Sequence, residues 1–343
     1  HYMLYIFDTC TDPYWNLAAE EYLLKEHTEP IFRIWRNDNA IIVGHYQNTI
    51  AEIDVDVVKK NNIKVVRRIT GGGAVFHDLG NVNFTFIERK NPNEDASAMF
   101  RRFTKPVLEA INSLGVKAYL EGRNDLLIDG CKFSGNAVCI YKDRVLQHGT
   151  MLFSSCMSDL AAALKARPEK FQGKAVQSTR KRVTNISEHL PLRNKGMSAT
   201  DFQQYILNFI MERYGGQIYE YTPTDIKAID KLCADKYSQE SWNFGSSPNY
   251  SFSNVKKLSG GIVEFYFDVE GGLIKNFKVF GDYFFTKPTE EFVALFEGTP
   301  HNYNIIEERV QNLDSELKKD TPLGIGAYFN GIDIHEIVSM FFK

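Results

Sequence analysis

The chain of 343 residues has no apolar run that approaches about 18 residues, the length that a membrane-spanning helix needs. It also lacks the basic segment and short apolar core of a secretory signal peptide. Cysteines are few and scattered, with neither zinc-site spacing nor a disulfide framework: Cys10, Cys131, Cys139, Cys156 and Cys233. We therefore expect a cytoplasmic protein with no membrane segment.

A large excess of either charge is also missing. The 40 Lys and Arg residues nearly balance the 43 Asp and Glu residues, which gives a formal net charge of -3. Nucleic-acid-binding domains usually carry a strongly basic face, so this balance argues against nucleic acid as a partner. The composition, 43% hydrophobic and 24% charged, is that of a globular protein, and the length suits one large and one smaller domain.

Three consecutive glycines, Gly71 to Gly73, follow two arginines, Arg67 and Arg68. Glycine runs lose much conformational entropy on folding, so a local requirement is expected to retain them. One such requirement is a backbone that lies flush against a ligand, with its N–H groups directed at anionic oxygens. The arginines favour phosphate or carboxylate as that ligand. The alternative is a tight, glycine-rich hairpin turn.

Two common phosphate-binding loops do not match this segment. No Gly-Lys-Ser/Thr follows the glycines, which excludes a Walker A loop. The segments 74–77 and 82–88 that follow are predicted as strands, whereas a dinucleotide-binding turn leads into a helix. A ligand at this loop is therefore expected to bind on a sheet, without a helix N-terminus.

Periodicity predicts helices and short strands throughout the first two thirds of the chain. Helices are expected at 12–27, 96–114, 158–165 and 199–214, with a break at Pro106 inside the second. Strands are expected at 31–35, 40–45, 63–68, 74–77, 82–88, 117–120, 125–128, 133–141 and 144–153. Turn residues near 242–249 predict a boundary, with one domain at 1–244 and a small α+β domain at 245–343 that contains a hairpin at 261–279.

Three polar segments interrupt the later strands, at 122–125, 129–137 and 147–150. Within the second, Lys132 lies between a turn and a run of small and apolar residues. An ammonium group on a short loop beside a sheet suits an acyl-phosphate oxygen. An exposed hairpin lysine is the plain alternative.

Together these segments resemble one family. Arg-Arg-Ile-Thr-Gly-Gly-Gly-Ala-Val-Phe-His-Asp-Leu-Gly-Asn (67–81), Gly-Arg-Asn-Asp-Leu (122–126), Lys-Phe-Ser-Gly-Asn-Ala (132–137), His-Gly-Thr (148–150) and Arg-Val-Thr-Asn-Ile (182–186) closely resemble the lipoate–protein ligases. The C-terminal segment matches that family's accessory domain in size. The resemblance implies an α+β fold shared with biotin protein ligases, with a mixed β-sheet flanked by helices and a small C-terminal domain.

The resemblance also implies a two-step reaction. Lipoate or octanoate and MgATP first give the acyl-AMP and pyrophosphate. The acyl group then passes to one lysine of a lipoyl domain of a 2-oxoacid dehydrogenase complex, or of glycine-cleavage H protein. ATP and Mg²⁺ are the implied cofactors.

The site residues carried over from the family fall into three groups. The adenylate is expected at Arg68, Gly73, Ala74, Val75, Phe76 and Lys132. Lipoate is expected at Lys132, Gly71, Gly72, His77 and His45, although either histidine is equally well explained as a packed core residue. Magnesium, ribose or adenylate contacts are expected at Asn81, Asn124, Asp125 and His148, with Asp125 as the candidate metal ligand.

Three rival functions share these features. An octanoyl or lipoyl transferase of the same fold would use a cysteine nucleophile, for which Cys131 and Cys156 are the candidates. A biotin ligase would carry a Gly-Arg-Gly-Arg type loop, which is absent. A binding or relay protein would not need Lys132 and both arginines. The intact glycine loop and the C-terminal segment favour the ATP-dependent ligase.

Overall fold

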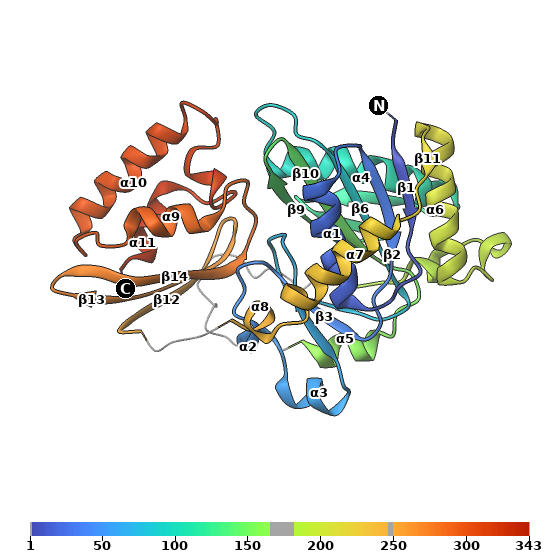
Figure 1. Ribbon diagram of the computed structural model, residues 1–343, viewed down its shortest axis with the longest axis horizontal. Helices are drawn as coiled ribbons and strands as arrows, with labels where there is room; N and C mark the ends of the chain where they lie inside the picture. Colours follow the sequence, from blue (N-terminus) through green and yellow to red (C-terminus); the bar gives the residue numbers. More distant parts are fainter. Residues whose placement is uncertain (1, 165–181, 246–249, 343) are drawn as a thin grey trace.

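The computed structural model describes residues 2–164, 182–245 and 250–342. Its main element is a mixed eight-stranded sheet with the order β11-β1-β2-β6-β10-β9-β8-β7 (Figure 1). The strands are β1 (Leu4–Phe7), β2 (Ile31–Trp35), β6 (Asn81–Arg89), β7 (Ala118–Glu121), β8 (Asp125–Ile128), β9 (Cys131–Tyr141), β10 (Arg144–Leu152) and β11 (Gln217–Ile218). Strand β1 runs parallel to β2 and β11, whereas β2, β6, β10, β9, β8 and β7 pair antiparallel in turn. The expected mixed sheet is confirmed.

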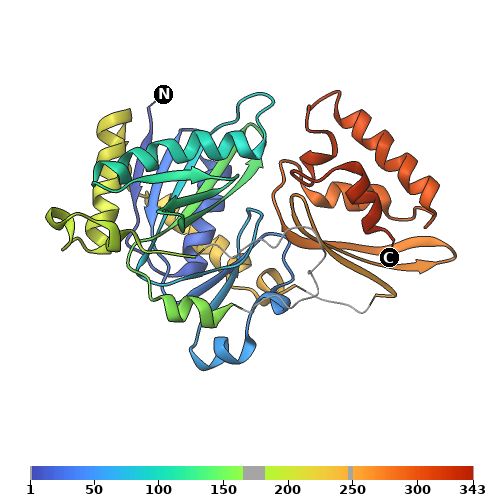
Figure 2. The ribbon, with the colours of Figure 1, turned by 180° about the vertical axis from the view of Figure 1, so that it is seen from behind.

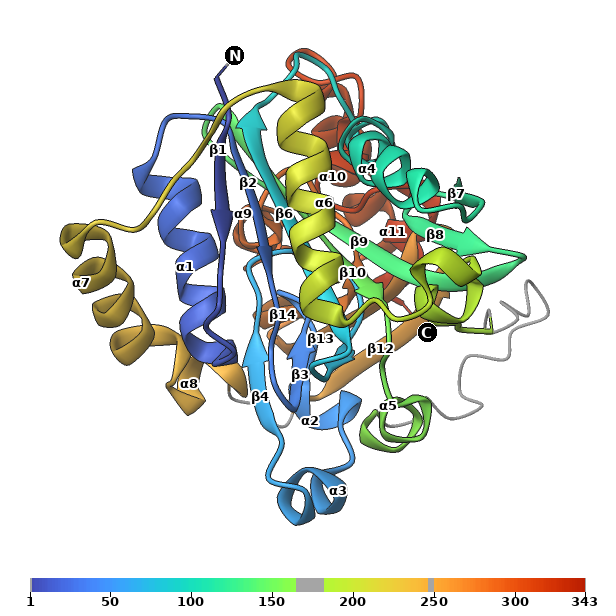
Figure 3. The same cartoon turned by 90° about the vertical axis from the view of Figure 1, so that its right-hand side faces the viewer.

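Helices cover both faces of this sheet (Figure 3). One face carries α1 (Pro13–Glu26) and α7 (Pro223–Leu232), and the other carries α4 (Ala96–Ser113) and α6 (Ala199–Tyr214). Side chains along β2 alternate accordingly: Phe32 and Ile34 join the core beneath α4 and α6, whereas Trp35 joins the core beneath α1. Each large apolar side chain buried in this way contributes roughly 1.5–3 kcal/mol.

Helix α4 corrects one expectation. Asp95 caps its N-terminus by accepting a hydrogen bond from the Ala98 N–H, and the helix then runs through Pro106 without a break. The proline removes one backbone hydrogen bond. Helix α4 nevertheless continues, because residues on both sides of the proline, including Phe103 and Val107, are buried in the core.

A second, three-stranded sheet with the order β4-β3-β5 carries the glycine loop. Its strands are β3 (Ala40–Val43), β4 (Lys64–Arg67) and β5 (Val75–His77), and short helices α2 (Thr49–Glu52), α3 (Val55–Lys60) and α5 (Met157–Ala163) lie beside it. The glycine loop connects β4 to β5 across the central strand β3. Strand β5 is an edge strand within the described residues, so its outer backbone edge pairs with no strand there.

The C-terminal part forms its own sheet and its own apolar core (Figure 2). It contains β12 (Phe252–Leu258), β13 (Gly261–Glu270), β14 (Leu273–Tyr283), α9 (Thr289–Phe296), α10 (Tyr303–Leu317) and α11 (Ile334–Met340). The expected hairpin is confirmed as β13–β14, while the sequence patterns did not predict β12. The boundary predicted at 244/245 falls between α8 (Glu240–Asn243) and β12.

The remaining helical turns are short: 3₁₀ segments at Ile186–His189, Leu192–Asn194 and Gly324–Ala327, and a π-helical turn at Cys233–Tyr237. None of the helices in the described ranges is both long and apolar enough to cross a membrane.

Candidate active site

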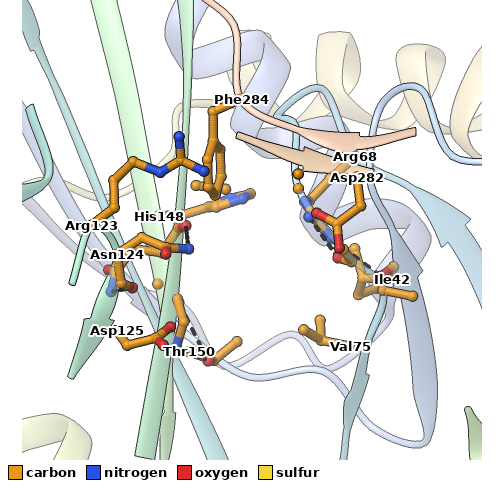
Figure 4. A pocket seen from close by; sticks show the side chains of 18 of the residues that line it. Ile42, Arg68, Val75, Arg123, Asn124, Asp125, His148, Thr150, Asp282 and Phe284 are labelled. Carbon is orange, nitrogen blue, oxygen red and sulfur yellow. Dashed lines mark hydrogen bonds between the residues drawn. The ribbon is translucent and has the colours of Figure 1, made fainter. Parts of the chain in front are cut away.

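A cavity of about 590 Å³ lies between the large sheet, the glycine loop and the C-terminal domain (Figure 4). The large sheet and its connections contribute Arg123, Asn124, Asp125, His148 and Thr150 on one side, and Arg68 and Val75 face them from the other (Figure 4). The C-terminal domain closes the space with Lys257, Leu258, Ser259, Gly260, Gly261, Ile262, Asp282 and Phe284.

One wall of this cavity is apolar. Leu17 of α1, Trp35 of β2 and Ile42 of β3 belong to a single buried cluster, and Val75 packs against it. These side chains come from four different elements, α1, β2, β3 and β5, that the fold brings together. The cavity therefore offers apolar surface beside several cations, an arrangement suited to a ligand with an apolar chain and an anionic group.

Lys132 extends into the cavity from β9, and its Nζ lies 3.0 Å from Asp125 Oδ1 on β8. Its side chain is 36% exposed, so the ammonium group faces the open space. The backbone of Lys132 is fixed by two hydrogen bonds to the Arg-Val-Thr-Asn segment, from Lys132 N to Arg182 O and from Thr184 N to Lys132 O. Two residues just before this segment, numbers 180 and 181, lie outside the described residues.

Arg67 and Arg68 point to opposite sides of the small sheet. Arg67 Nη1 donates to the carbonyl oxygens of Gly44, His45 and Gln47, and burial lowers the pKa of its guanidinium to about 10. Arg67 does not line the cavity and instead holds the segment after β3 in place. The expectation that both arginines favour an anion at this loop is therefore wrong for Arg67 in its observed position.

Arg68 lines the cavity, and its guanidinium also donates hydrogen bonds to the backbone of the glycine loop. Its Nη2 donates to the carbonyl oxygens of Gly71 and Gly73, both at 2.7 Å, and its Nε donates to Thr70 Oγ1 at 3.0 Å. Burial lowers the pKa of Arg68 to about 10, which leaves it protonated at neutral pH. Arg68 thus fixes the shape of the loop from inside.

The glycines are needed where the loop meets the C-terminal domain. A Cβ on Gly71 would lie 2.4 Å from Tyr283 O, and one on Gly73 would lie 2.6 Å from Asp282 Oδ2. Gly72 has φ 94°, and its N–H donates to Tyr283 O at 3.1 Å. In this structure the close backbone approach is therefore to strand β14. Gly72 lines the cavity together with Gly73, Ala74 and Val75, whereas Gly71 does not.

Phe76 also lies outside the cavity. Its side chain is buried in a cluster with Ile41, Val43 and Val65, because alternate residues of β5 face opposite sides. Any contact of Phe76 with a nucleotide would have to use its backbone.

His77 lines the cavity and is 4% exposed. Burial, aided by the charges of Arg68 and His148, lowers its pKa to about 3, so the ring is neutral at pH 7. Asn37 Nδ2 donates to His77 Nδ1 at 3.1 Å, which leaves the proton on Nε2. Within the described residues Nε2 has no hydrogen-bond partner. The neutral ring of His77 can therefore donate a hydrogen bond from Nε2.

The other predicted residues are divided between the cavity and the core. Asn124, Asp125 and His148 line the cavity, whereas His45 and Asn81 do not. His45 lies among aromatic rings at the domain interface, including Trp242 and Phe285. Asn81 donates to Asn83 Oδ1 at 2.8 Å beside the cavity.

The cavity offers few protein ligands for a metal ion. No group of three or more His, Cys, Asp and Glu side chains among the described residues is placed to hold one. Asp125 is the predicted ligand, and its carboxylate is paired with Lys132. Because Mg²⁺ commonly binds through one or two carboxylates and the phosphates of its nucleotide, Asp125 fits such an ion only if the phosphates supply most of the ligands.

The sequence patterns did not identify the residues that the C-terminal domain adds. Lys257 and Asp282 reach the cavity from strands more than 100 residues away in the chain, and no local motif marks them. Arg123 was part of a recognised motif, but its contacts were not foreseen: it donates to Gly260 O and Asn330 O and lies 4.8 Å above the Phe284 ring.

Comparison with known proteins identifies the family. Residues 12–211 match the family described as the lipoyl protein ligase A/B catalytic domain, and residues 247–341 match the bacterial lipoate protein ligase C-terminus. The chain belongs to the lipoate–protein ligase family. It is a ligase, as the resemblance implied.

Relatives match this ligase over most of its length. It is 39% identical over 332 residues to lipoate–protein ligase 1 of Staphylococcus aureus, covering 96% of this chain and 97% of that protein. It is 38% identical over 309 residues to lipoate-protein ligase LplJ of Bacillus subtilis, covering 88% and 92%.

Solved structures share the ligase fold. LipL1 of P. falciparum, solved in complex with lipoate, has a TM-score of 0.74 at 23% identity, covering 92% of this chain and 98% of that one. A lipoate-protein ligase A bound with ATP has a TM-score of 0.60 at 28% identity, covering 71% and 98%. A bipartite ligase from Thermoplasma acidophilum, described with its E2 lipoyl domain, has a TM-score of 0.62 at 30% identity, covering 74% and 100%.

Proposed function

We propose that this ligase joins free lipoate or octanoate to a specific protein lysine in two steps, the first of which consumes ATP. A carboxylate oxygen of the acid attacks the α-phosphorus of ATP, the bond to the β-phosphate oxygen breaks, and pyrophosphate leaves. The acceptor lysine amine then attacks the acyl carbon, AMP leaves, and an amide forms. The acceptors are lipoyl domains of 2-oxoacid dehydrogenase complexes or glycine-cleavage H protein.

The observation that carries the proposal is the position of Lys132. Its ammonium group faces a cavity that has an apolar wall on one side and the cation-bearing glycine loop on the other. The first step brings a carboxylate toward a phosphate, two anions that repel each other unless positive charge lies between them. We assign that screening to Lys132, which would exchange Asp125 for the acyl carboxylate and the α-phosphate.

The glycine loop is assigned to the nucleotide. The residues Gly73 to Val75 line the cavity, and a related ligase that was solved with ATP supports nucleotide binding by this protein. The apolar wall of Leu17, Trp35, Ile42 and Val75 is assigned to the acyl chain. His77 Nε2–H supplies a donor to an acceptor atom of either ligand.

The acceptor assignment draws on relatives. The Thermoplasma acidophilum ligase is described with its E2 lipoyl domain. The acceptor lysine of such a domain would reach the cavity when the C-terminal domain moves. Glycine-cleavage H protein remains an expectation from the family resemblance.

No observation favours the cysteine-dependent transferase. Cys131 and Cys156 both lie within the described residues, and neither lines the cavity. A thioester mechanism needs the nucleophile at the acyl carbon, beside Lys132 and the apolar wall.

Lipoate-dependent exchange of labelled pyrophosphate into ATP tests the first step. Lys132→Ala should lower the exchange rate by more than about 100-fold, as loss of a key charge-stabilising group does. Lys117→Ala, which removes an exposed lysine ahead of β7, is the matched control and should exchange at the wild-type rate. A folded Lys132→Ala variant with normal exchange would contradict the role of Lys132, and wild-type protein without exchange would contradict ATP activation.

A further inference from the structure

Glu20 is a carboxylate that the sequence patterns did not single out. It lies on α1, is 0% exposed, and faces the pair of strands β6 and β10. Thr85 and His148, directly opposite each other in that pair, both bind it. His148 Nδ1 lies 2.8 Å from Oε1, and Thr85 Oγ1 donates to Oε2 at 2.7 Å. A buried charge requires such partners, because leaving it unpaired would be strongly destabilising.

The partners of Glu20 fix the proton on His148. Burial by itself would raise the pKa of the Glu20 carboxyl, but the charge and hydrogen bond of His148, with Arg33 and Thr85, hold it below its ordinary value. Glu20 is therefore an ionised acceptor, and Nδ1 of His148 must carry a proton. Carboxylates that bind one ring nitrogen orient imidazole rings in this way at many functional sites.

The other ring nitrogen of His148 reaches the segment just before the glycine loop. His148 Nε2 lies 2.6 Å from Thr70 Oγ1, and Thr70 is 0% exposed. Thr70 Oγ1 also accepts a hydrogen bond from Arg68 Nε at 3.0 Å, so this one hydroxyl joins His148 to Arg68. Each group thus orients the next.

This series of hydrogen bonds ends on the backbone of the glycine loop. The Nη2 of Arg68 donates to Gly71 O and Gly73 O, both at 2.7 Å. A continuous series of hydrogen bonds therefore runs from the carboxylate of Glu20 through His148, Thr70 and Arg68 to the glycine loop. Removal of the first member would loosen the last, because linked hydrogen bonds reinforce one another.

We propose that Glu20 is a positioning residue for the nucleotide, which acts through His148, Thr70 and Arg68 to hold the glycine loop in its ATP-binding shape. The assignment of ATP to the loop rests on the proposed function. Glu20 touches neither ligand and contributes no proton to the chemistry.

The next residue in α1 offers a matched control. Glu21 is 5% exposed and is also a buried carboxylate, but it binds Lys236 Nζ at 2.6 Å and Tyr237 Oη at 3.0 Å. Replacement of either glutamate by glutamine removes one buried charge from the same helix. Only the replacement of Glu20 alters the series of hydrogen bonds that leads to the glycine loop.

The test is direct titration of the full-length protein with MgATP by calorimetry, without lipoate. Glu20→Gln and Thr70→Val should each weaken ATP binding by about three- to tenfold, the equivalent of one hydrogen bond. The double variant should bind ATP no more weakly than the weaker-binding single variant, because both changes interrupt the same series of hydrogen bonds. Thr70→Ser keeps the hydroxyl and should bind ATP more tightly than Thr70→Val does. Glu21→Gln should bind ATP with wild-type affinity.

Three results would overturn the inference. The first is a folded Glu20→Gln variant that binds ATP with wild-type affinity. The second is a double variant in which the losses of ATP affinity caused by Glu20→Gln and Thr70→Val multiply. If Glu20→Gln does not fold, equal affinities of the Thr70→Val and Thr70→Ser variants would overturn it instead. These results require that the wild type binds ATP. Wild-type protein that fails to bind ATP would contradict the proposed function together with this inference.

Discussion

Single residues in this ligase have separate roles that their types alone do not reveal. Arg67 and Arg68 are adjacent and both buried, yet Arg67 supports the segment after β3 and only Arg68 reaches the cavity. Arg67 is the last residue of β4 and Arg68 follows it directly, so the alternation of strand side chains explains the difference. The same rule separates Phe76, which is in the core, from the cavity-lining residues Val75 and His77.

His77 gives a prediction about pH and stability. Its pKa in the folded protein is about 3, below its ordinary value of 6.5, so on acidification the unfolded chain takes up a proton that the folded one does not. The contribution to stability is present above pH 6.5 and is lost as the pH falls toward 3. Between pH 7 and 5.5 the wild type should lose about 1 kcal/mol of unfolding free energy more than His77→Gln. Urea denaturation at both pH values measures this, and parallel losses in the two proteins would contradict it.

At the scale of elements, the glycine loop matters because it touches two partners. Arg68 holds it from the cavity side, and β14 of the C-terminal domain meets it from outside through Tyr283 O. Glycine is required at position 71 for space, since the nearest atom to an added Cβ is a backbone oxygen that cannot rotate away.

Gly71→Ala should therefore destabilise the protein. We expect a loss of about 1–3 kcal/mol, typical of an overpacked contact, in urea denaturation at pH 7. Gly196→Ala is the control, because Gly196 has open space around its Cβ position and no positive φ. If the two alanine variants were equally stable, the contact with Tyr283 would not constrain the loop.

Elements with strong local patterns could be predicted from the sequence, whereas those formed by distant contacts could not. The strand Ile31–Trp35 and the helix Ala199–Tyr214 were predicted at their observed bounds, because their apolar residues follow a clear period. Strand β1 was missed because no turn residues precede its four residues, whereas turn residues flank the equally short β8, which was predicted at its bounds. In the site, Lys132 and Arg68 stood out by motif. Glu20 and Asp282 did not, because Glu20 meets His148 and Asp282 meets the glycine loop only in the folded protein, more than 100 residues apart in the sequence.

At the scale of the whole molecule, the C-terminal domain closes the active site. Arg123 binds two of its carbonyl groups, Gly72 N–H binds a third, and Tyr46 donates to Glu290 of α9. We propose that these contacts open in the second step of the reaction, so that an acceptor lysine on another protein can approach Lys132.

The predicted movement is measurable by small-angle X-ray scattering. A non-hydrolysable analogue of lipoyl-AMP should change the scattering profile, because occupation of the cavity displaces the contacts at Asp282 and Phe284. Lipoate alone is the control and should leave the profile unchanged. Identical profiles with and without the analogue would show that the acceptor reaches the site by another route.

Intact-mass analysis of an apo lipoyl domain, incubated with this ligase and free lipoate, tests the central claim most directly. The account predicts a lipoyl mass increment that appears only when MgATP is present and that Lys132→Ala fails to produce. Transfer from an acyl-carrier thioester without ATP, in place of that increment, would contradict the account and point to a cysteine nucleophile.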